Sequence, residues 1–328
     1  MKQTSFSDAE FASKKRLTRR DRFLAEIEAV TPWPSLAAAL LPYYPKGEER
    51  GRPPVGLERM LRMYIAQQCF GLSDEGIEDA IYDSQAIRGF VGIDLTHESA
   101  PDATMLLKFR RLLEKHNLTR RIFDEVNGHL VSKGLMMREG TIVDAPLIAA
   151  PPSTKKSRRE TRSGNASVEE GKELVLRHEG SYRRRCQVRP DAYARDHAGN
   201  VFDVTQTHNP LHGDETMVFD DAGYQGADKR PVNVDKAVIW HIAMKRSVRK
   251  AMKKNPLGRA REKLEKAKAS VRAKVEHPFH VLKNLFKHRK TRYRGLAKNT
   301  AQLHTLFAFA NLVLAGRTFG SAHARTPS

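Results

Sequence analysis

Three acidic residues lie where a metal site could form, each in a different part of the chain. Asp144 lies within the short β-branched run TIVDAPLI, and Asp221 ends the run MVFDD just before the turn AGYQG. Glu276 lies in RAKVEHPFHVLK, a segment otherwise rich in cations. Two Asp and one Glu make a hard oxygen ligand set, which Mg²⁺ prefers. Two such ions bridged by a carboxylate can activate a water or a 3′-hydroxyl for in-line displacement at phosphorus.

Each of the three carboxylates also has a purely structural explanation. Burying an unpaired charge is costly, so Asp144 could cap the end of its strand instead of binding a metal. Asp221 could cap the tight turn that follows it, and Glu276 could be an ion-pair partner for its basic surroundings. The residues alone leave both explanations open.

The charge of the chain favours a nucleic-acid partner. The formal net charge is +20, and the window 245–298 holds 20 Lys or Arg against 3 acids, so it carries 17 of that charge. Clustered cations neutralise phosphates and release counterions, which gives salt-dependent binding. Aromatic residues make up 7% of the chain, which favours contacts with a duplex backbone over stacking on single strands. A ribosome-associated protein or a merely basic surface is the alternative.

The basic segment around Glu276 is predicted to be helical. The positions of Arg272, Glu276 and Lys283 are offset by four and then seven residues, so on one helix they share a face. On such a face the acid would hold a metal ion and the cations would hold phosphates. Pro278 lacks an amide donor and is expected to kink this helix just after Glu276.

The first part of the chain has helical periodicity. Apolar residues recur at helical spacing in LERMLRMYIAQQCF, residues 57–70, and Ser73 offers an N-cap for the next helix. Further helices are predicted from about Asp102 and from Thr119 to a stop at Gly134. The first of these two contains KFRRLLEK, whose cations could lie against DNA or simply face solvent. These cations are Lys108, Arg110 and Arg111.

After Gly140 the pattern changes to short apolar runs typical of strands. TIVDAPLI, MVFDDAGYQG and KAVIWHIAM predict strands, and helices follow at 261–283 and 303–316. Strands followed by helices predict an α+β domain, after an all-helical front segment. The expected division is a basic arm at 1–35, a helical DNA-binding domain at 36–134, the α+β domain at 138–312 and a disordered tail at 313–328.

Nothing in the sequence indicates a membrane or a disulfide framework. No run approaches the roughly 18 apolar residues that a membrane span needs, and the polar start MKQTSFSDAEFASKK is not a signal peptide. The two cysteines, Cys69 and Cys186, match neither a disulfide scaffold nor a zinc knuckle. We therefore expect a cytoplasmic protein with no membrane partner.

In its motifs the chain resembles bacterial DDE transposases of the insertion sequence 5 group. The matching stretches are GTIVDAPLIAAP around Asp144, VFDDAGYQG around Asp221, and an R-x3-E-x6-K signature. Arg272, Glu276 and Lys283 meet that signature. The front MLRMYIAQQCFGLSDEGIEDAIYDS and the tail YRGLAKNTAQLHTLFAFANL are also similar to the family, so the resemblance covers about residues 15–312.

The resemblance implies an RNase H-like catalytic fold, with a central mixed sheet flanked by helices, and metal-dependent cleavage and strand transfer at insertion-sequence ends. It implies that Asp144, Asp221 and Glu276 hold two Mg²⁺ ions, for which Mn²⁺ can substitute, with Arg272 and Lys283 near the phosphates. The implied partners are double-stranded DNA, as terminal inverted repeats and target, and further copies of the chain in a homo-oligomer. Such a transposase is expected in the cytoplasm, associated with the nucleoid.

The chain departs from the family pattern at two places. The tyrosine that the family has three residues before the arginine of the signature is Ala269 here, so we expect a weaker hold on DNA ends. The fold also needs a β-hairpin between the first two aspartates. The 26 residues 172–197 contain 6 Arg and no sustained alternation, which is not a hairpin pattern.

A pair of compensating frameshifts would explain the segment 172–197. Permitted codons for ELVLRHEGSYRRRC, shifted by one base, encode NWYFGMKAHIGVDA, which resembles the WYFGMKAHIGVD typical of the family. On this hypothesis the hairpin is disrupted, and the copy is an inactive, DNA-binding remnant of a transposase. The alternative is a genuine insertion loop that binds DNA.

Overall fold

The computed structural model describes residues 16–46, 53–135, 141–144, 147–148, 172–173, 176–180, 186–187, 217–220, 225–229, 231–234, 238–251, 255–272, 276–293 and 296–323. The chain forms two compact units. The first, called here the helical unit, contains the residues up to 129 together with 285–287 and those from 308 onward. The second, called the sheet unit, contains 130–284 and 288–307.

The helices of the first unit begin and end at local sequence signals. The Oγ of Ser73 accepts a 2.9 Å hydrogen bond from the amide of Gly76 and so caps α5 (Asp74–Asp83). Gly71, with a φ of +65°, ends α4 (Leu57–Phe70) in the left-handed conformation. The helix predicted at 57–70 and the cap at Ser73 are confirmed. The other helices are α2 (Arg19–Val30), α3 (Trp33–Leu40), the 3₁₀ turn η1 (Leu41–Tyr43), α6 (Gln85–Val91), α7 (Ala103–Lys115) and α8 (Leu118–Ser132).

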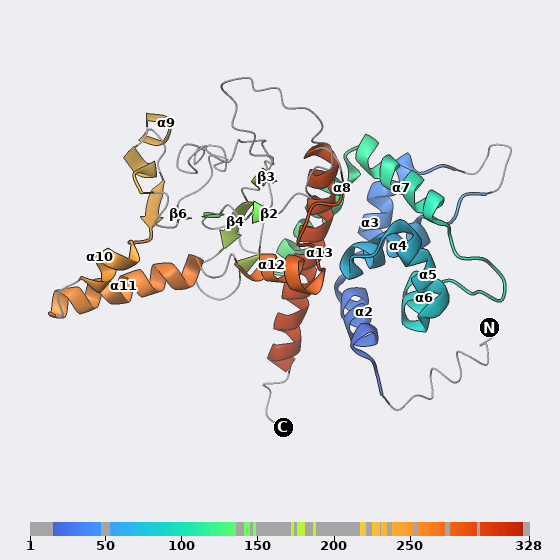
Figure 1. Cartoon of the computed structure of the whole chain (residues 1–328), viewed down its shortest axis with the longest axis horizontal. Coiled ribbons are helices and arrows are strands. Elements are labelled where there is room, and N and C mark those ends of the chain that lie inside the picture. The colour runs from blue at the N-terminus through green and yellow to red at the C-terminus, as the bar shows by residue number, and fades with distance from the viewer. Residues whose placement is uncertain are drawn as a thin grey trace, which may run out of the picture. The chain divides into compact units, whose positions relative to one another are not determined.

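The apolar faces of these helices meet in one core. Ile27, Leu61 and Ile77, from α2, α4 and α5, are fully buried. The rings of Tyr64 and Phe109 pack edge to face, with their centroids 6.0 Å apart. The helix α4 contacts α3, α5, α6 and α7, so it is the central helix of the unit (Figure 1). Because α4 is surrounded, even its glutamines 67 and 68 are buried.

The segment expected as a basic arm, 1–35, contains α2 and the start of α3. Thr18 caps α2 in a capping box: its hydroxyl accepts from the amide of Asp21 at 3.2 Å, and the Asp21 carboxylate accepts from the amide of Thr18 at 2.7 Å. Leu24 and Ile27 of α2 are buried in the core. Apolar periodicity did not reveal this helix. Only two of its positions are buried, and the segment KKRLTRRDR at its start carries seven charges.

The expected disordered tail at 313–328 is corrected, because α13 (Leu296–His323) continues through most of it. Val313 is buried, and the Nδ2 of Asn311 donates a 3.0 Å hydrogen bond to the Oδ1 of Asn127 within the helical unit. The apolar run that was predicted to end as a helix at 316 therefore extends further and belongs, from 308 onward, to the helical unit.

The sheet unit holds a five-stranded mixed sheet in the order β5-β4-β1-β6-β7. Its strands are β1 (Thr141–Asp144), β4 (Leu176–Gly180), β5 (Cys186–Gln187), β6 (Met217–Asp220) and β7 (Ile239–Ile242). The strand β6 runs parallel to both β1 and β7, whereas β4 runs antiparallel to both β1 and β5. A separate antiparallel pair joins β2 (Leu147–Ile148) to β3 (Lys172–Glu173). Each of the three runs predicted as strands contains at least one strand, and TIVDAPLI contains both β1 and β2.

The structure differs from the expected loss of the hairpin between the first two aspartates. The strands β4 and β5 lie within 172–197 and pair antiparallel, with Glu179 opposite Gln187 and Gly180 opposite Cys186. The strand β4 also pairs with β1 over four positions. Hydrogen bonds between strands join backbone groups, so they form without the alternation of side chains on which the expectation was based.

The helices of the sheet unit follow the strands in sequence. They are the 3₁₀ turn η4 (Ala227–Lys229), α9 (Pro231–Val234), α10 (Arg246–Lys250), α11 (Pro256–Arg272), α12 (Glu276–His280), the π-helical turn η6 (Val281–Leu285) and the first part of α13. The helix α11 packs against β6, and Phe279 of α12 packs edge to face on Phe307 of α13 at 5.7 Å. No helix within the described ranges is long and apolar enough to cross a membrane.

The expected kink at Pro278 stays a prediction, because residues 273–275 lie outside the described residues. Pro278 lies in the first described turn of α12 (Glu276–His280). At the start of a helix the amide that proline lacks would have no partner within the helix, so a proline is tolerated there.

His288 makes the stability of the sheet unit depend on pH. Its side chain is 2% exposed, and in the described part of the chain its Nδ1 has no hydrogen-bond partner. Burial lowers the pKa of His288 to about 4, and the charge of Arg292 acts in the same direction. The unfolded chain, with an ordinary pKa of 6.5, binds a proton that the folded chain excludes. Stability is therefore complete above pH 6.5 and falls as the pH falls towards 4.

We expect this loss to be about 3 kcal/mol. It is measured by urea unfolding of the full chain at a series of pH values, compared with the variant His288→Gln. The difference in unfolding free energy between wild type and His288→Gln should become smaller as the pH falls from 6.5 towards 4, because the wild type loses stability there. Parallel curves would show that His288 does not titrate as its burial implies.

Candidate metal centre and nucleic-acid interface

The positions of the two predicted aspartates follow two neighbouring strands. Asp144 is the last residue of β1, and Asp221 directly follows Asp220, the last residue of β6. The strands are adjacent and parallel, with Thr141 opposite Val218 and the following residues in the same register. Parallel strands end at the same edge of a sheet, so β1 and β6 bring their carboxyl ends together. The side chain of Asp144 and the whole of Asp221 lie outside the described residues.

The third carboxylate and its two cations lie in three different elements. Arg272 is the last residue of α11, Glu276 is the first residue of α12, and Lys283 lies in the π-helical turn that follows. Residues 273–275, between α11 and α12, lie outside the described residues, so the shared helical face stays a prediction. The helix α12 and the π-helical turn are contiguous, however, so Glu276 and Lys283 are still carried by one short stretch of chain. The side chains of Glu276 and Arg272 lie outside the described part of the structure.

The predicted carboxylates stay the candidate metal ligands of the sheet unit. Among the side chains that the structure describes, no group of three His, Cys, Asp or Glu could hold a metal ion. The predicted ligands Asp144, Asp221 and Glu276 are not among those side chains, so their fit to a metal rests on their chemistry. Carboxylate oxygens are hard donors that suit Mg²⁺ and Mn²⁺. The described side chains thus offer no competing site.

A buried carboxylate that the sequence analysis missed fixes α11 to the end of β7. Glu265 is 7% exposed; its Oε2 accepts a 2.9 Å hydrogen bond from the amide of Met244, and its Oε1 lies 2.9 Å from the Nζ of Lys268. Burial alone would raise the pKa of Glu265, but these hydrogen bonds and the charges of Lys268 and Arg249 hold it below its ordinary value. The spacing of Glu265 and Lys268 is visible in REKLEKAK, whereas the burial of the pair is not.

Arg110, predicted to contact DNA, is instead buried in the helical unit. Its guanidinium donates two hydrogen bonds, of 2.7 and 2.8 Å, to the two oxygens of Asp74, which also accepts from Gln67 at 2.6 Å. The hydrogen bond from Arg110 is the largest of the effects that hold the pKa of Asp74 below its ordinary value. This corrects the prediction for Arg110, which joins α7 to the start of α5. Lys108 and Arg111 are exposed on α7.

An exposed aromatic and basic cluster joins the turn after α3 to the end of α7 and to α8. The ring of Tyr43, after α3, lies 5.0 Å from that of His116 after α7, and Arg121 of α8 donates a 3.5 Å hydrogen bond to the Tyr43 hydroxyl. All three side chains are exposed. This Tyr43 cluster combines cationic and hydroxyl donors, which suit a DNA backbone. Sequence analysis missed it because Tyr43 lies in a proline-rich connector without periodicity.

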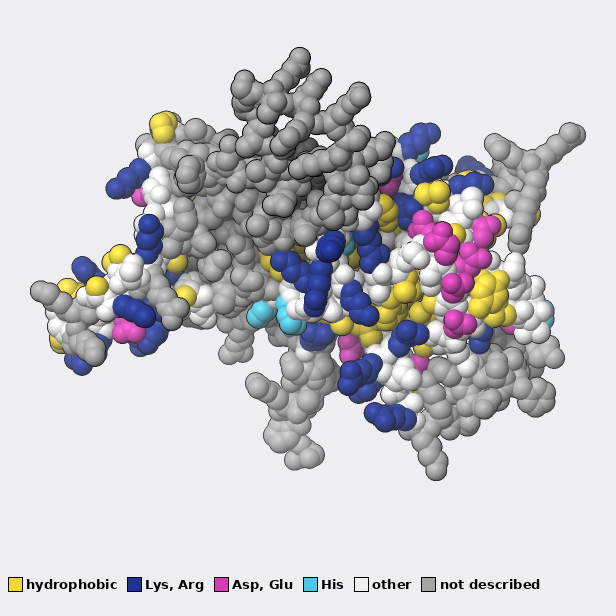
Figure 2. Space-filling view, viewed as in Figure 1, with side chains coloured by type: hydrophobic (Ala, Val, Ile, Leu, Met, Phe, Trp, Pro, Cys, Tyr) yellow, Lys and Arg dark blue, Asp and Glu magenta, His cyan; other side chains and the backbone are white. Residues whose placement is uncertain are grey.

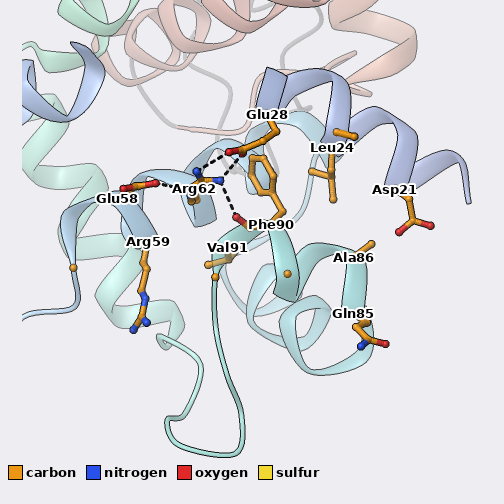
Figure 3. Close-up of a pocket in the computed structure, with 14 residues that line it drawn as sticks. Asp21, Leu24, Glu28, Glu58, Arg59, Arg62, Gln85, Ala86, Phe90 and Val91 are labelled. Carbon is orange, nitrogen blue, oxygen red and sulfur yellow. Dashed lines mark hydrogen bonds and ion pairs between the residues drawn. The ribbon is translucent and has the colours of Figure 1, made fainter. Parts of the chain in front are cut away.

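A groove of about 750 Å³ between α2, α4 and α6 is lined by three carboxylates and two arginines (Figure 3). Arg62 on its wall donates to Glu58 at 2.9 Å and to both oxygens of Glu28 at 2.5 and 2.9 Å. The Arg62 guanidinium also lies 4.0 Å from the ring centre of Trp33. The carboxylates of Glu28, Glu58 and Asp21 line the groove. Because carboxylates repel phosphates, we expect DNA to bind to other faces of the helical unit.

Comparison with known families places the chain among transposases. The family described as "Transposase domain (DUF772)" matches residues 11–112, and the family described as "Transposase DDE domain" matches residues 136–312. The second match covers more than half of the chain, and the chain belongs to the DDE transposase family. The resemblance to DDE transposases seen in the motifs is confirmed, in the predicted order of a helical front and a DDE domain. Membership of the insertion sequence 5 group stays a prediction.

Proposed function

We propose that this protein is a transposase of the insertion sequence 5 group, which cleaves DNA at the ends of its element and joins those ends to target DNA. The parallel pairing of β1 with β6 carries the proposal. If the printed register, with Ile142 opposite Phe219, were continued by two residues, the position of Asp144 would be opposite that of Asp221. Opposite positions share one face of a sheet and successive positions alternate, which supports Asp221 as the second ligand and disfavours Asp220.

The topology of the sheet supports an RNase H-like fold for the DDE domain. The first strand, β1, is central; it is antiparallel to β4 on one side and parallel to β6 on the other. A further strand extends each side, β5 next to β4 and β7 next to β6. The resemblance implied a central mixed sheet, and this strand order supports the proposal.

In this proposal Asp144, Asp221 and Glu276 hold two Mg²⁺ ions, for which Mn²⁺ can substitute. When bound, the ions act as Lewis acids on the scissile phosphate and lower the pKa of the attacking water or 3′-hydroxyl. Arg272 and Lys283 bind phosphates beside the carboxylates. Two element ends must be held together for joining, so we propose a homo-oligomer on DNA, acting in the cytoplasm at the nucleoid.

The helical unit is proposed to bind the element ends, the terminal inverted repeats. Lys108 and Arg111 are exposed on α7, and the Tyr43 cluster joins the end of α7 to α8 and to the turn after α3. Clustered cations bind the duplex backbone with little dependence on sequence. The carboxylates of the groove around Arg62 leave these faces as the basic ones.

The proposed reaction is tested with a supercoiled plasmid that carries the DNA flanking both sides of the gene. This DNA should contain the element ends, whatever their sequence. We expect strand breaks at the element ends with Mg²⁺ or Mn²⁺, joined products on longer incubation, and neither product with a chelator present. A folded, DNA-binding protein that leaves the plasmid intact with both metals would contradict the proposed reaction.

Lys283 is expected to contribute one phosphate contact. The variant Lys283→Ala should lower the affinity for duplex DNA and reduce the slope of log affinity against log salt by about one. The matched control is Lys298→Ala, which removes an exposed cation from α13. Both variants are compared by fluorescence anisotropy over a range of salt. A slope that is the same in wild type and Lys283→Ala would show that Lys283 faces solvent.

A catalytically inactive, DNA-binding remnant is the second candidate, and the codons permitted for the segment 172–197 favour it, although β4 and β5 pair within this segment. Its codons can be chosen to spell a family-like hairpin in a shifted frame, as argued above. The test is to read the coding DNA for residues 165–202 in all three frames. A shifted frame that spells the hairpin would favour the remnant, whereas a frame that spells nothing would make the segment a genuine part of the protein.

A further inference from the structure

Arg289 is held in place by a chain of side-chain hydrogen bonds next to the π-helical turn. Its Nε donates a 3.2 Å hydrogen bond to the carbonyl oxygen of Lys283, and its Nη2 donates a 3.1 Å hydrogen bond to the Oδ1 of Asn284. The Nδ2 of Asn284 lies 2.9 Å from the Nδ1 of His280. The π-helical turn ends α12, where carbonyls lack their usual amide partners, so the guanidinium satisfies one of them. We call this arrangement the Arg289 clamp.

The clamp leaves Arg289 at the surface, in a region of positive charge. Arg289, Asn284 and His280 are all exposed. From His277 to Lys298 the sequence contains no Asp or Glu, so no carboxylate within this stretch neutralises the guanidinium. Figure 2 shows His side chains beside Lys and Arg side chains over α12. Structural arginines are usually covered and paired with an acid, as the half-buried Arg62 and the buried Arg110 are here.

We propose that Arg289 is a DNA-backbone contact of the sheet unit, pre-oriented by Asn284; this inference rests on the proposed function. The two hydrogen bonds of the clamp use two of the five N–H donors of a guanidinium, which leaves others for a phosphate. An arginine whose rotamers are already restricted loses less freedom on binding, so it binds more tightly than a free one. A duplex phosphate fits this site because its oxygens accept the forked donors of arginine.

The position of the clamp relates it to the reaction. Asn284 and Glu276 are carried by the contiguous α12 and π-helical turn, where eight residues of helix span on the order of 12 Å. A phosphate on Arg289 would therefore lie near the strand that Glu276 helps to cut. The backbone of Lys283 is part of the clamp, so the clamp also positions the second cation of the signature.

The test uses the full chain and a mixed-sequence DNA duplex, because phosphate contacts do not depend on sequence. The variant Arg289→Ala should weaken binding about tenfold and reduce the salt slope by about one. Asn284→Ala removes no charge, so it should weaken binding about threefold with an unchanged slope. In the double variant the loss should equal that of Arg289→Ala alone, because Asn284 acts through Arg289.

The matched control is Lys290→Ala, which removes the same charge from the next exposed position. It should weaken binding clearly less than Arg289→Ala does. Arg289→Lys, which keeps the charge without the fork, should bind with intermediate affinity and an unchanged slope. Thermal unfolding followed by circular dichroism shows that each variant is folded. Equal losses in Arg289→Ala and Lys290→Ala, or an unchanged affinity in Asn284→Ala, would overturn the proposal.

This test separates the clamp from the proposed reaction. A wild type that binds the duplex but does not cut the plasmid would contradict the reaction, and the effect of Arg289→Ala on affinity would still support the clamp. A wild type that binds and cuts while Arg289→Ala binds equally well would support the reaction and overturn the clamp.

Discussion

Each of the variants Asp144→Asn, Asp221→Asn and Glu276→Gln should cut DNA about a thousandfold more slowly than the parent in Mg²⁺. An amide has nearly the shape of a carboxylate but lacks its negative charge, so the ligand is lost with little change in packing. Affinity for duplex DNA should stay within about twofold, because the cations that bind phosphates are untouched. Cleavage is measured in single-turnover conditions on the plasmid with the flanking DNA, and affinity by anisotropy.

Asp220→Asn is the matched control for these variants. Asp220 ends β6 one position before Asp221, and successive positions of a strand lie on opposite faces of the sheet. The control should therefore cut at close to the parent's rate. Cleavage at the parent's rate by one of the three variants would remove that residue from the metal site. If Asp220→Asn cut DNA as slowly as Asp221→Asn, the loss of cleavage would come from a change at the end of β6 and not from the loss of a metal ligand.

The variant Arg110→Met should destabilise the helical unit by about 3 kcal/mol. Methionine keeps much of the length of the side chain, but it leaves Asp74 without the two hydrogen bonds of the guanidinium. The side chains of Arg110 and Asp74 are 10% and 23% exposed, so water replaces those bonds poorly. Unfolding in urea is followed by the fluorescence of Trp33 in a Trp240→Phe background, which reports on the helical unit.

The control Arg111→Met removes a charge from the next position of α7, which is exposed, and should change stability little. The dependence of stability on pH in acid gives a second check of the Arg110–Asp74 ion pair. A lowered pKa at Asp74 means that the ion pair stabilises the fold above the ordinary pKa of 3.8 and that this contribution is lost as the pH falls through the lower folded value. The difference in stability between wild type and Arg110→Met should therefore shrink as the pH falls below 3.8. If the difference in stability did not change with pH, packing and not the ion pair would be responsible for the destabilisation by Arg110→Met.

Local signals in the sequence were enough for several elements. Apolar spacing predicted α4, Ser73 predicted the start of α5, and three short apolar runs predicted the positions of β1, β6 and β7. These signals work because a helix or strand buries one face, and a cap forms within one turn of the chain. The motifs around Asp144, Asp221 and Glu276 predicted the family in the same way.

Contacts between distant segments decided what the sequence did not show. Arg110 and Arg111 are adjacent in KFRRLLEK, and only the packing of α5 against α7 buries one and exposes the other. The same holds for α2. Its residues Leu24 and Ile27 are buried only because other helices cover them. Burial depends on which element covers a face, and that element can be far away in the sequence.

The sequence by itself determined the family, the acidic residues suited to a metal site, and the helical front followed by an α+β domain. Each of these depends on residue types and on spacing within short segments. The tertiary structure alone decided that β1 and β6 are parallel neighbours, that the residues of the signature lie in three elements, and that Arg289 is clamped to Asn284. These features depend on backbone pairing and on packing, because the positions of side chains in space follow from how the segments pack.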